Sequence, residues 1–314
     1  MENLIFSLNA TMPVFLLMVI GYGLKQVGIF DEVFASKVNK FVFKITLPAL
    51  VFKELSNANF YEMWDTKFVI FCFGASLLSI LASVGLSMLI KDESIRGEFA
   101  QASYRSSSAL LGCAFVQNIY GSAGSASLMI IAAVPLYNVA AVLILNFLKP
   151  NRGKMSRALI RKTLWDVITN PIIIGILLGM GWSLLQIPQP TIMAKTVLNV
   201  ANLATPLGLM ALGADFSFKQ SKENIGLAIA SSSLKLIGFT SVFLPIAVAL
   251  NFRAEKLVAI LVMLGAATTV SCFVMARNLG HKGTLTSTTV VLTTLASAFT
   301  LTIWLYILRS LALI

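Results

Sequence analysis

Residues 35–55 read ASKVNKFVFKITLPALVFKEL, and residues 193–213 read MAKTVLNVANLATPLGLMALG. The two stretches lie 158 positions apart, and at this offset both a lysine and a proline coincide. The matched pairs at this offset are Pro13 with Pro171, Gly21 with Gly179, Gly23 with Gly181, Ile29 with Ile187, Lys37 with Lys195, and Pro48 with Pro206. General similarity between apolar helices does not explain proline and glycine pairs that recur in order. The sequence therefore predicts two related halves, residues 1–150 and 151–314.

The composition places most of the chain in lipid. Hydrophobic residues make up 57% of the chain and charged residues 12%, whereas a soluble domain has about 25% charged residues. A transmembrane helix needs about 20 mostly apolar residues. Windows of that length predict ten spans, at residues 5–25, 35–55, 67–90, 98–119, 125–148, 163–185, 190–214, 223–250, 255–276 and 285–310.

Five spans in each half make the second half enter the membrane from the opposite side. We therefore expect an all-α membrane protein built from two inverted five-helix repeats, a plan typical of secondary transporters. The longest polar stretch, residues 149–162, is too short to bury a core of its own. The start Met1-Glu2-Asn3 lacks the basic residues of a cleavable signal peptide, so we expect the first apolar segment to remain a helix.

The net charge of +11 is arranged as an orientation signal. Most lysine and arginine residues fall in alternate loops, and the loop at residues 149–162 is the richest of them. Because basic loops stay in the cytoplasm, the pattern predicts a multi-pass protein of the plasma or inner membrane with both termini outside. The same pattern argues against nucleic acid as a partner.

Two prolines mark where helices are expected to bend or break. Pro48 and Pro206 each remove a backbone donor and free a carbonyl one turn earlier. Binding sites in transporters lie near the bilayer midplane, where such freed groups are available. A proline kink used for packing alone is also common, but the matching positions favour a shared hinge role.

The fourth and ninth spans carry small and hydroxyl-bearing residues at membrane depth. Residues 106–114 read SSSALLGCA, and residues 265–272 read GAATTVSC. Small residues let backbones approach closely, and hydroxyl groups can bond freed backbone groups. Broken helices and tight unbroken packing are both compatible with these stretches.

Few charges fall inside the predicted spans. Lys235 lies near the middle of the eighth span, whereas Lys44 and Arg105 lie close enough to the cytoplasmic side that we expect them to extend to the surface. A buried cation is costly and marks function. Without an acidic residue at a helix centre, this balance favours an anionic substrate. Lys235 would bind that substrate or stand in for a coupling cation.

Together these segments resemble the auxin efflux carrier family, including its bacterial malate and malonate permease branch. The resemblance covers nearly the whole chain. It rests on Thr46-Leu47-Pro48-Ala49-Leu50, on Gly112 followed by Asn118-Ile119-Tyr120-Gly121, on Asn170-Pro171, on Thr205-Pro206-Leu207 with Leu212-Gly213-Ala214, and on Ser271-Cys272-Phe273-Val274-Met275-Ala276.

The resemblance implies a scaffold of helices one, two, six and seven, and a transport domain made from the rest. Helices four and nine would be unwound and cross near the substrate, as in bile-acid symporters and sodium/proton antiporters. The family usually has Asn and Pro where this chain has Ser107 and Ala114, and Pro where it has Thr269. The expected substrate contacts are Ser107, Gly112, Cys113, Asn138, Thr268, Thr269, Ser271 and Lys235.

The leading hypothesis is thus a carrier for a small organic anion such as malate, malonate or an auxin-like weak acid, coupled to H⁺ or Na⁺ or running as an exchanger. A cation/proton antiporter or a sodium symporter of the bile-acid type remains an alternative on the same fold. A remote alternative is an intramembrane aspartyl protease using Asp166 and Asp215, although Ala214 stands where its motif needs glycine.

No metal or other cofactor is expected. Cys72, Cys113, Cys272 and His281 show no metal-ligand spacing. We expect no enzymatic activity. The expected partners are the lipid bilayer and a small organic anion, and a homodimer is one assembly that the chain could form.

Overall fold

The computed structural model of the chain describes residues 13, 16–56, 64–108, 116, 119–120, 124–149, 165, 168–216, 222 and 224–314. Within these ranges the protein is helical and contains no strand, which confirms the all-α class. Five helices of the described part are long and apolar enough to cross a membrane. They are Thr66–Ser87, Leu128–Phe147, Thr191–Ala214, Ile225–Ala249 and Thr284–Ser310. The complete set of ten spans stays a prediction.

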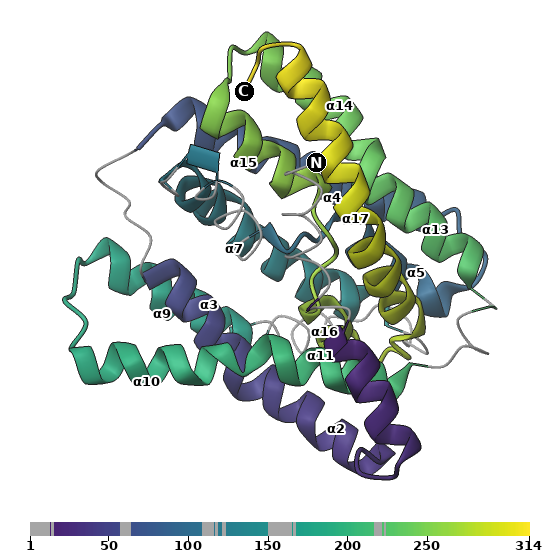
Figure 1. Cartoon of the computed structure of the whole chain (residues 1–314). Coiled ribbons are helices and arrows are strands. Elements are labelled where there is room, and N and C mark those ends of the chain that lie inside the picture. Colours follow the sequence, from purple (N-terminus) through teal and green to yellow (C-terminus); the bar gives the residue numbers. More distant parts are fainter. Residues whose placement is uncertain are drawn as a thin grey trace.

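The described helices pack as two groups, each drawn from both halves of the sequence (Figure 1). The first helix group comprises residues 16–26, α2 (Glu32–Phe41), the π-helical η1 (Val42–Thr46), α3 (Leu47–Ser56), α9 (Pro171–Leu184), α10 (Thr191–Asn202) and α11 (Ala204–Asp215). The second helix group comprises α4 (Thr66–Ser87), α5 (Glu93–Tyr104), α7 (Gly124–Phe147), α13 (Ile225–Ser233), the π-helical η3 (Leu234–Gly238), α14 (Phe239–Ala249), α15 (Ala254–Gly265) and α17 (Thr284–Ser310). The short helix α16 (Ser271–Asn278) contacts both groups.

Acidic and amide side chains set where several helices begin. Asp31 accepts a hydrogen bond from the Phe34 N–H at the start of α2, and Asp65 accepts one from Phe68 at the start of α4. Asn170 caps α9 ahead of a proline in the first helical turn. Such caps satisfy N–H groups that have no partner within the helix. Hydrogen bonding to Lys256 and to the Phe68 N–H lowers the pKa of Asp65.

Glycines bring the backbones of the first helix group into direct contact. A Cβ atom added at Gly21 would lie 2.1 Å from the Met210 carbonyl oxygen, and one at Gly179 would lie 2.9 Å from the Phe52 carbonyl oxygen. The same offset of 158 separates Gly21 from Gly179 and Phe52 from Met210. One type of close contact therefore occurs twice, once in each half.

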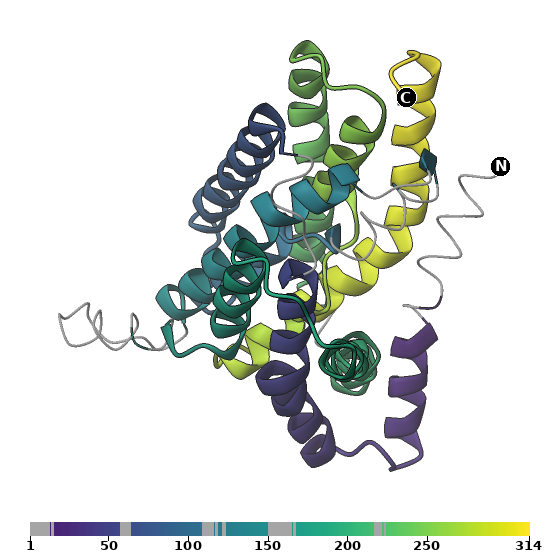
Figure 2. The same ribbon diagram turned by 90° about the vertical axis from the view of Figure 1, so that its left-hand side faces the viewer.

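These contacts place α10 and α11 between two segments of the N-terminal half. Figure 2, which views α10 and α11 nearly end-on, shows them flanked by residues 16–26 on one side and by α2 and α3 on the other. Gly213 reinforces the arrangement, because a Cβ there would meet the backbone of Met18. Backbone contacts at these glycines thus add to the side-chain packing within the first helix group.

Both predicted hinge prolines follow a disturbance in their helix. The helix continues through Pro48, but the turn before it widens into η1. Before Pro206, α10 ends at Asn202 and α11 begins at Ala204, so the missing N–H falls in the first turn of α11. In that turn no N–H has an intrahelical acceptor. Neither proline therefore leaves a broken hydrogen bond inside a regular α-helix.

The glycine contacts predict a paired effect on stability. Gly21→Ala and Gly179→Ala should each lower the free energy of unfolding by about 1–3 kcal/mol, because the added methyl group overpacks a backbone contact. Gly23→Ala and Gly181→Ala are matched controls, since nothing lies within 4 Å of a Cβ at either position. Thermal unfolding of the detergent-purified protein, followed with a thiol-reactive dye at buried Cys72 and Cys272, would measure the difference. Equal unfolding temperatures for all four variants would contradict the close packing.

Candidate functional site

Two helices of the second group are interrupted. Helix α5 ends at Tyr104, and the backbone of Arg105 is extended (φ −67°, ψ 132°). Helix α15 ends at Gly265, the backbone of Ala266 is extended (φ −75°, ψ 163°), and α16 begins only at Ser271. These interruptions fall in the predicted fourth and ninth spans.

The two interrupted segments satisfy each other's backbone groups. The Ser107 N–H donates to the Ala267 carbonyl at 2.9 Å. The Thr268 hydroxyl donates to the Ala102 carbonyl in the last turn of α5, at 3.1 Å. The Ser106 hydroxyl donates to the Val262 carbonyl in the last turn of α15, also at 3.1 Å. In lipid, freed backbone groups need partners within the protein, so each interruption is stabilised by the other.

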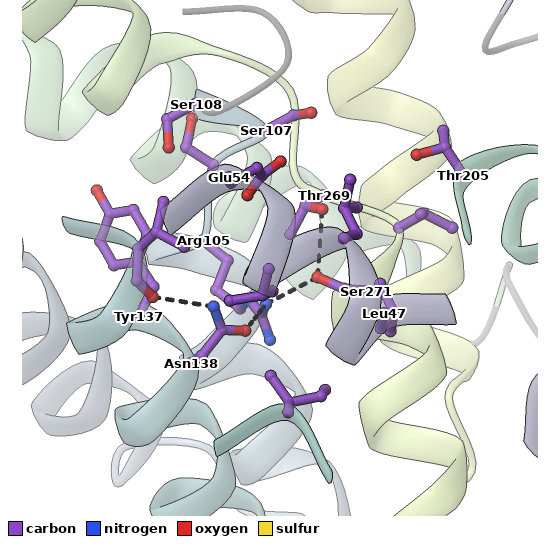
Figure 3. A pocket seen from close by; sticks show the side chains of 16 residues that line it. Leu47, Glu54, Arg105, Ser107, Ser108, Tyr137, Asn138, Thr205, Thr269 and Ser271 are labelled. Carbon is purple, nitrogen blue, oxygen red and sulfur yellow. Dashed lines mark hydrogen bonds between the residues drawn. The ribbon is translucent and has the colours of Figure 1, made fainter. Parts of the chain in front are cut away.

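A cavity of about 60 Å³ lies where the interrupted segments meet the first helix group (Figure 3). Since one water needs roughly 10–15 Å³, the cavity holds a few waters or a small organic molecule. The second group and the segments beside it contribute Arg105, Ser106, Ser107, Ser108, Val134, Tyr137, Asn138, Thr269, Val270 and Ser271. The first group contributes Leu47, Leu50, Val51, Glu54, Ile172 and Thr205.

Arg105 supplies a buried positive charge to this cavity. Its side chain is 2% exposed. One terminal nitrogen (Nη2) donates to Asn138 Oδ1 at 2.8 Å and to Ser271 Oγ at 2.7 Å, and the other (Nη1) points to Met275 Sδ at 2.6 Å. The Nε atom has no hydrogen-bond partner in the described part of the chain. The guanidinium is thus oriented by α7 and α16 and keeps unused donor capacity.

Three neighbouring residues that line the cavity have backbone N–H groups without a described partner. No described residue accepts a hydrogen bond from the N–H groups of Thr269, Val270 or Ser271, which precede and begin α16. The Ser108 hydroxyl, also at the cavity, has no partner among the described residues. Free N–H groups at the start of a helix favour negative charge, so they act in the same direction as the arginine.

One acidic side chain lines the same cavity. Glu54 comes from α3 on the opposite side, and Figure 3 shows its carboxylate among the polar side chains of the site. In the described part of the chain no residue donates a hydrogen bond to it, and no ion pair joins it to Arg105. The cavity therefore contains an unpaired carboxylate and an arginine without a carboxylate partner.

The structure gathers part of the predicted site. Ser107, Asn138, Thr269 and Ser271 line the cavity. Thr268 is buried and bonds Ala102 and Thr293 instead. Lys235 does not line the cavity but bonds the end of α15. Pro48 and Pro206 lie within α3 and α11 and do not line the cavity either. Gly112 and Cys113 fall outside the described residues.

Sequence reasoning misplaced Arg105 and missed Glu54. Arg105 was expected to extend to the surface, but its hydrogen bonds hold it inside the protein. Its position next to three serines in a small-residue stretch could have indicated a break that draws the side chain inward. Glu54 lies near the end of its span, so it drew no attention. Lys44, the other basic residue that was expected to extend to the surface, is exposed.

The alternative sites receive no support. No group of three potential metal ligands occurs among the described residues. For the protease alternative, Asp166 falls outside the described residues and Asp215 is the last residue of α11.

Comparison with known proteins identifies the family. A family model described as "Membrane transport protein" matches residues 6–305. The chain belongs to this membrane transport protein family. This family includes the auxin efflux carrier-like proteins, so the match confirms the resemblance inferred from the sequence.

Relatives in the membrane transport protein family extend over the same length. The chain is 23% identical over 308 residues to an uncharacterized transporter of Methanothermobacter thermautotrophicus, covering 96% of this chain and 98% of that protein. It is also 23% identical over 310 residues to an uncharacterized transporter of Methanocaldococcus jannaschii, with the same coverage. Both alignments support a membrane transporter without indicating what it carries.

The two neighbouring threonines provide a test of the crossing. Thr268→Val should destabilise the protein by about 1–3 kcal/mol, because Ala102 loses a buried hydrogen bond. Thr269→Val should leave stability nearly unchanged, since the Thr269 side chain is partly exposed at the cavity and bonds only Ser271 among described residues. Thermal unfolding of both variants gives the comparison. A larger loss for Thr269→Val than for Thr268→Val would be inconsistent with this crossing.

Proposed function

We propose that the protein is a secondary transporter that carries a small organic anion, such as malate, malonate or another weak acid, by alternating access. One observation carries the proposal. Arg105 is buried at the crossing of two interrupted helices, lines a cavity, and has no carboxylate partner in the described part of the chain.

The energetics of a buried arginine favour an anionic ligand. Moving a cation out of water costs several kcal/mol unless an anion or good hydrogen bonds compensate. The partners of Arg105 are neutral, namely an amide, a hydroxyl and a thioether. A carboxylate in the cavity would supply the missing charge, and the planar guanidinium suits a carboxylate in two-point contact.

The surroundings of Arg105 support a carboxylate rather than a neutral ligand. The N–H groups of residues 269–271 and the hydroxyls of Ser107, Ser108 and Thr269 offer donors at the same cavity. Arg105 thus takes the role that the sequence had suggested for Lys235, while Asn138 and Ser271 position it.

Alternating access would come from two inverted five-helix repeats, residues 1–150 and 151–314. The repeated contacts of Gly21 with Met210 and of Gly179 with Phe52 support this symmetry. In such a plan the two conformations exchange the roles of the halves. The first helix group would form the scaffold and the second the moving domain, with both termini outside as the loop charges indicate.

Glu54 would link the transport to protons. An ionised carboxylate in the same small cavity repels an anionic substrate, so substrate binding favours protonated Glu54. By reciprocity, protonation of Glu54 favours substrate binding. Among the described residues, the ionisable side chains that line the cavity are Glu54, Arg105 and Tyr137. Anion and proton would therefore bind together and move in the same direction.

Substitution of Arg105 tests the anion site. In vesicles containing the purified protein, uptake of labelled malonate, malate and indole-3-acetate would be measured for the parent, Arg105→Gln and Arg105→Lys. We expect Arg105→Gln to weaken affinity roughly 10- to 100-fold, the loss of one or two charged hydrogen bonds, and Arg105→Lys to retain part of it. Arg96→Gln, which removes a surface pair with Glu93, is the control. Parental uptake by Arg105→Gln would rule out the proposed site.

Substitution of Glu54 tests the proton linkage. For the parent, affinity for the transported anion should rise as the pH falls, because protonation removes the competing charge. Glu54→Gln should bind the anion with acid-like affinity at every pH and lose its response to an imposed proton gradient. Uptake at several pH values, with and without an ionophore, measures both effects. An unchanged pH profile in Glu54→Gln would exclude the residue as the coupling group.

A further inference from the structure

Lys235 lies away from the cavity and bonds the free end of an interrupted helix. It belongs to the π-helical segment η3 and is 1% exposed. Its Nζ donates to the carbonyl oxygens of Leu264 and, at 3.3 Å, of Met263. Both carbonyls lie in the last turn of α15, which ends at Gly265 and so leaves them without intrahelical partners.

Among the described residues, this helix end is what compensates the charge of Lys235. In the described part of the chain no carboxylate pairs with it. The end of an α-helix carries about half a negative charge from its aligned peptide groups. A lysine ammonium brings three donors on a flexible stem, and from η3 that stem reaches the end of α15. Lys235 and the end of α15 therefore form a buried pair of cation and dipole.

The oxygen atoms around this end resemble a cation site that is already filled. Besides the two carbonyls, the Thr240 hydroxyl is fully buried and has no partner among the described residues. It lies close to the end of α15, because a Cβ at Gly265 would be 3.0 Å from Thr240 Oγ1. The ends of broken helices supply carbonyl oxygens to Na⁺ in other secondary transporters.

We propose that Lys235 is a tethered cation, which occupies the end of α15 permanently and removes the need for a free monovalent cation there. Its contacts explain why a lysine is tolerated at membrane depth without an acidic partner. Lys235 is thus a positioning residue: it fixes the end of α15 and, through it, residues 266–270 at the crossing. The consequence for transport rests on the proposed function, whereas the effect on the helix end does not.

Removal of the ammonium should create a site for a small cation. The parent protein, Lys235→Ala and Lys235→Met would be purified as full chains, and thermal unfolding would be measured in choline chloride, sodium chloride and methylammonium chloride at equal ionic strength. Alanine opens space beside the carbonyls, whereas methionine fills much of that space without charge. Lys44→Ala is the matched control, because Lys44 also lies in a π-helical segment, η1, but is exposed.

The expected pattern separates a charge effect from a packing effect. The parent and Lys44→Ala should unfold at one temperature in all three salts. Lys235→Ala should unfold several degrees lower in choline, and sodium or methylammonium should restore the difference as its concentration rises. Lys235→Met should stay low in every salt. Parental stability of Lys235→Met, or failure of every small cation to restore Lys235→Ala, would overturn the proposal. If Lys235→Ala cannot be purified in a folded state, Lys235→Met alone decides.

Uptake measurements complete the test. In vesicles, malonate uptake by the parent should be equal in choline and sodium buffers, whereas uptake by Lys235→Ala should require sodium or methylammonium. Sodium-dependent uptake by the parent would contradict a permanently filled site. If neither protein takes up malonate, the choice of substrate fails, and the unfolding temperatures still decide the role of Lys235.

Discussion

The structure depends on one constraint: a helix interrupted inside a membrane must find hydrogen-bond partners for the backbone groups that the interruption frees. Helices α5 and α15 meet it together. The segment after each helix bonds a carbonyl in the last turn of the other, through Ser106 in one direction and Thr268 in the other. These mutual hydrogen bonds hold the two interruptions in place relative to each other, and the cavity lies where they meet the first helix group.

This arrangement assigns different tasks to two buried cations. Arg105 stands directly after α5 and faces the cavity, where neutral partners orient it. Lys235 extends from η3 to the end of α15, where its ammonium group donates hydrogen bonds to backbone carbonyls. A charge that serves a ligand must keep capacity unused, whereas a charge that serves the fold must be satisfied. The hydrogen bonds of the two residues differ in this way.

Much of the fold could be predicted from the sequence because lipid imposes simple rules on length and apolarity. The small and hydroxyl residues of the fourth and ninth spans were compatible with interrupted or unbroken helices, and the family resemblance implied the interruptions that the structure shows. The site was harder to predict. Thr268 and Thr269 are neighbours of one residue type, yet one bonds backbone and the other lines the cavity. Where the backbone leaves the helix, periodicity no longer tells which way a side chain points. Arg105 was misplaced for the same reason, because an unbroken helix would have put its side chain close to the cytoplasmic surface.

The glycine contacts of the first helix group limit where the molecule can yield. Backbone pressed against backbone has no intervening side chains that could change rotamer, so residues 16–26 form one stiff pair with α11, and α3 forms another with α9. The interface that can move more easily is then the one between the first and second helix groups, which α16 bridges. Glu54 lies on one side of that interface and Arg105 on the other. A charged molecule bound as proposed would contact both walls and change the electrostatic attraction between them.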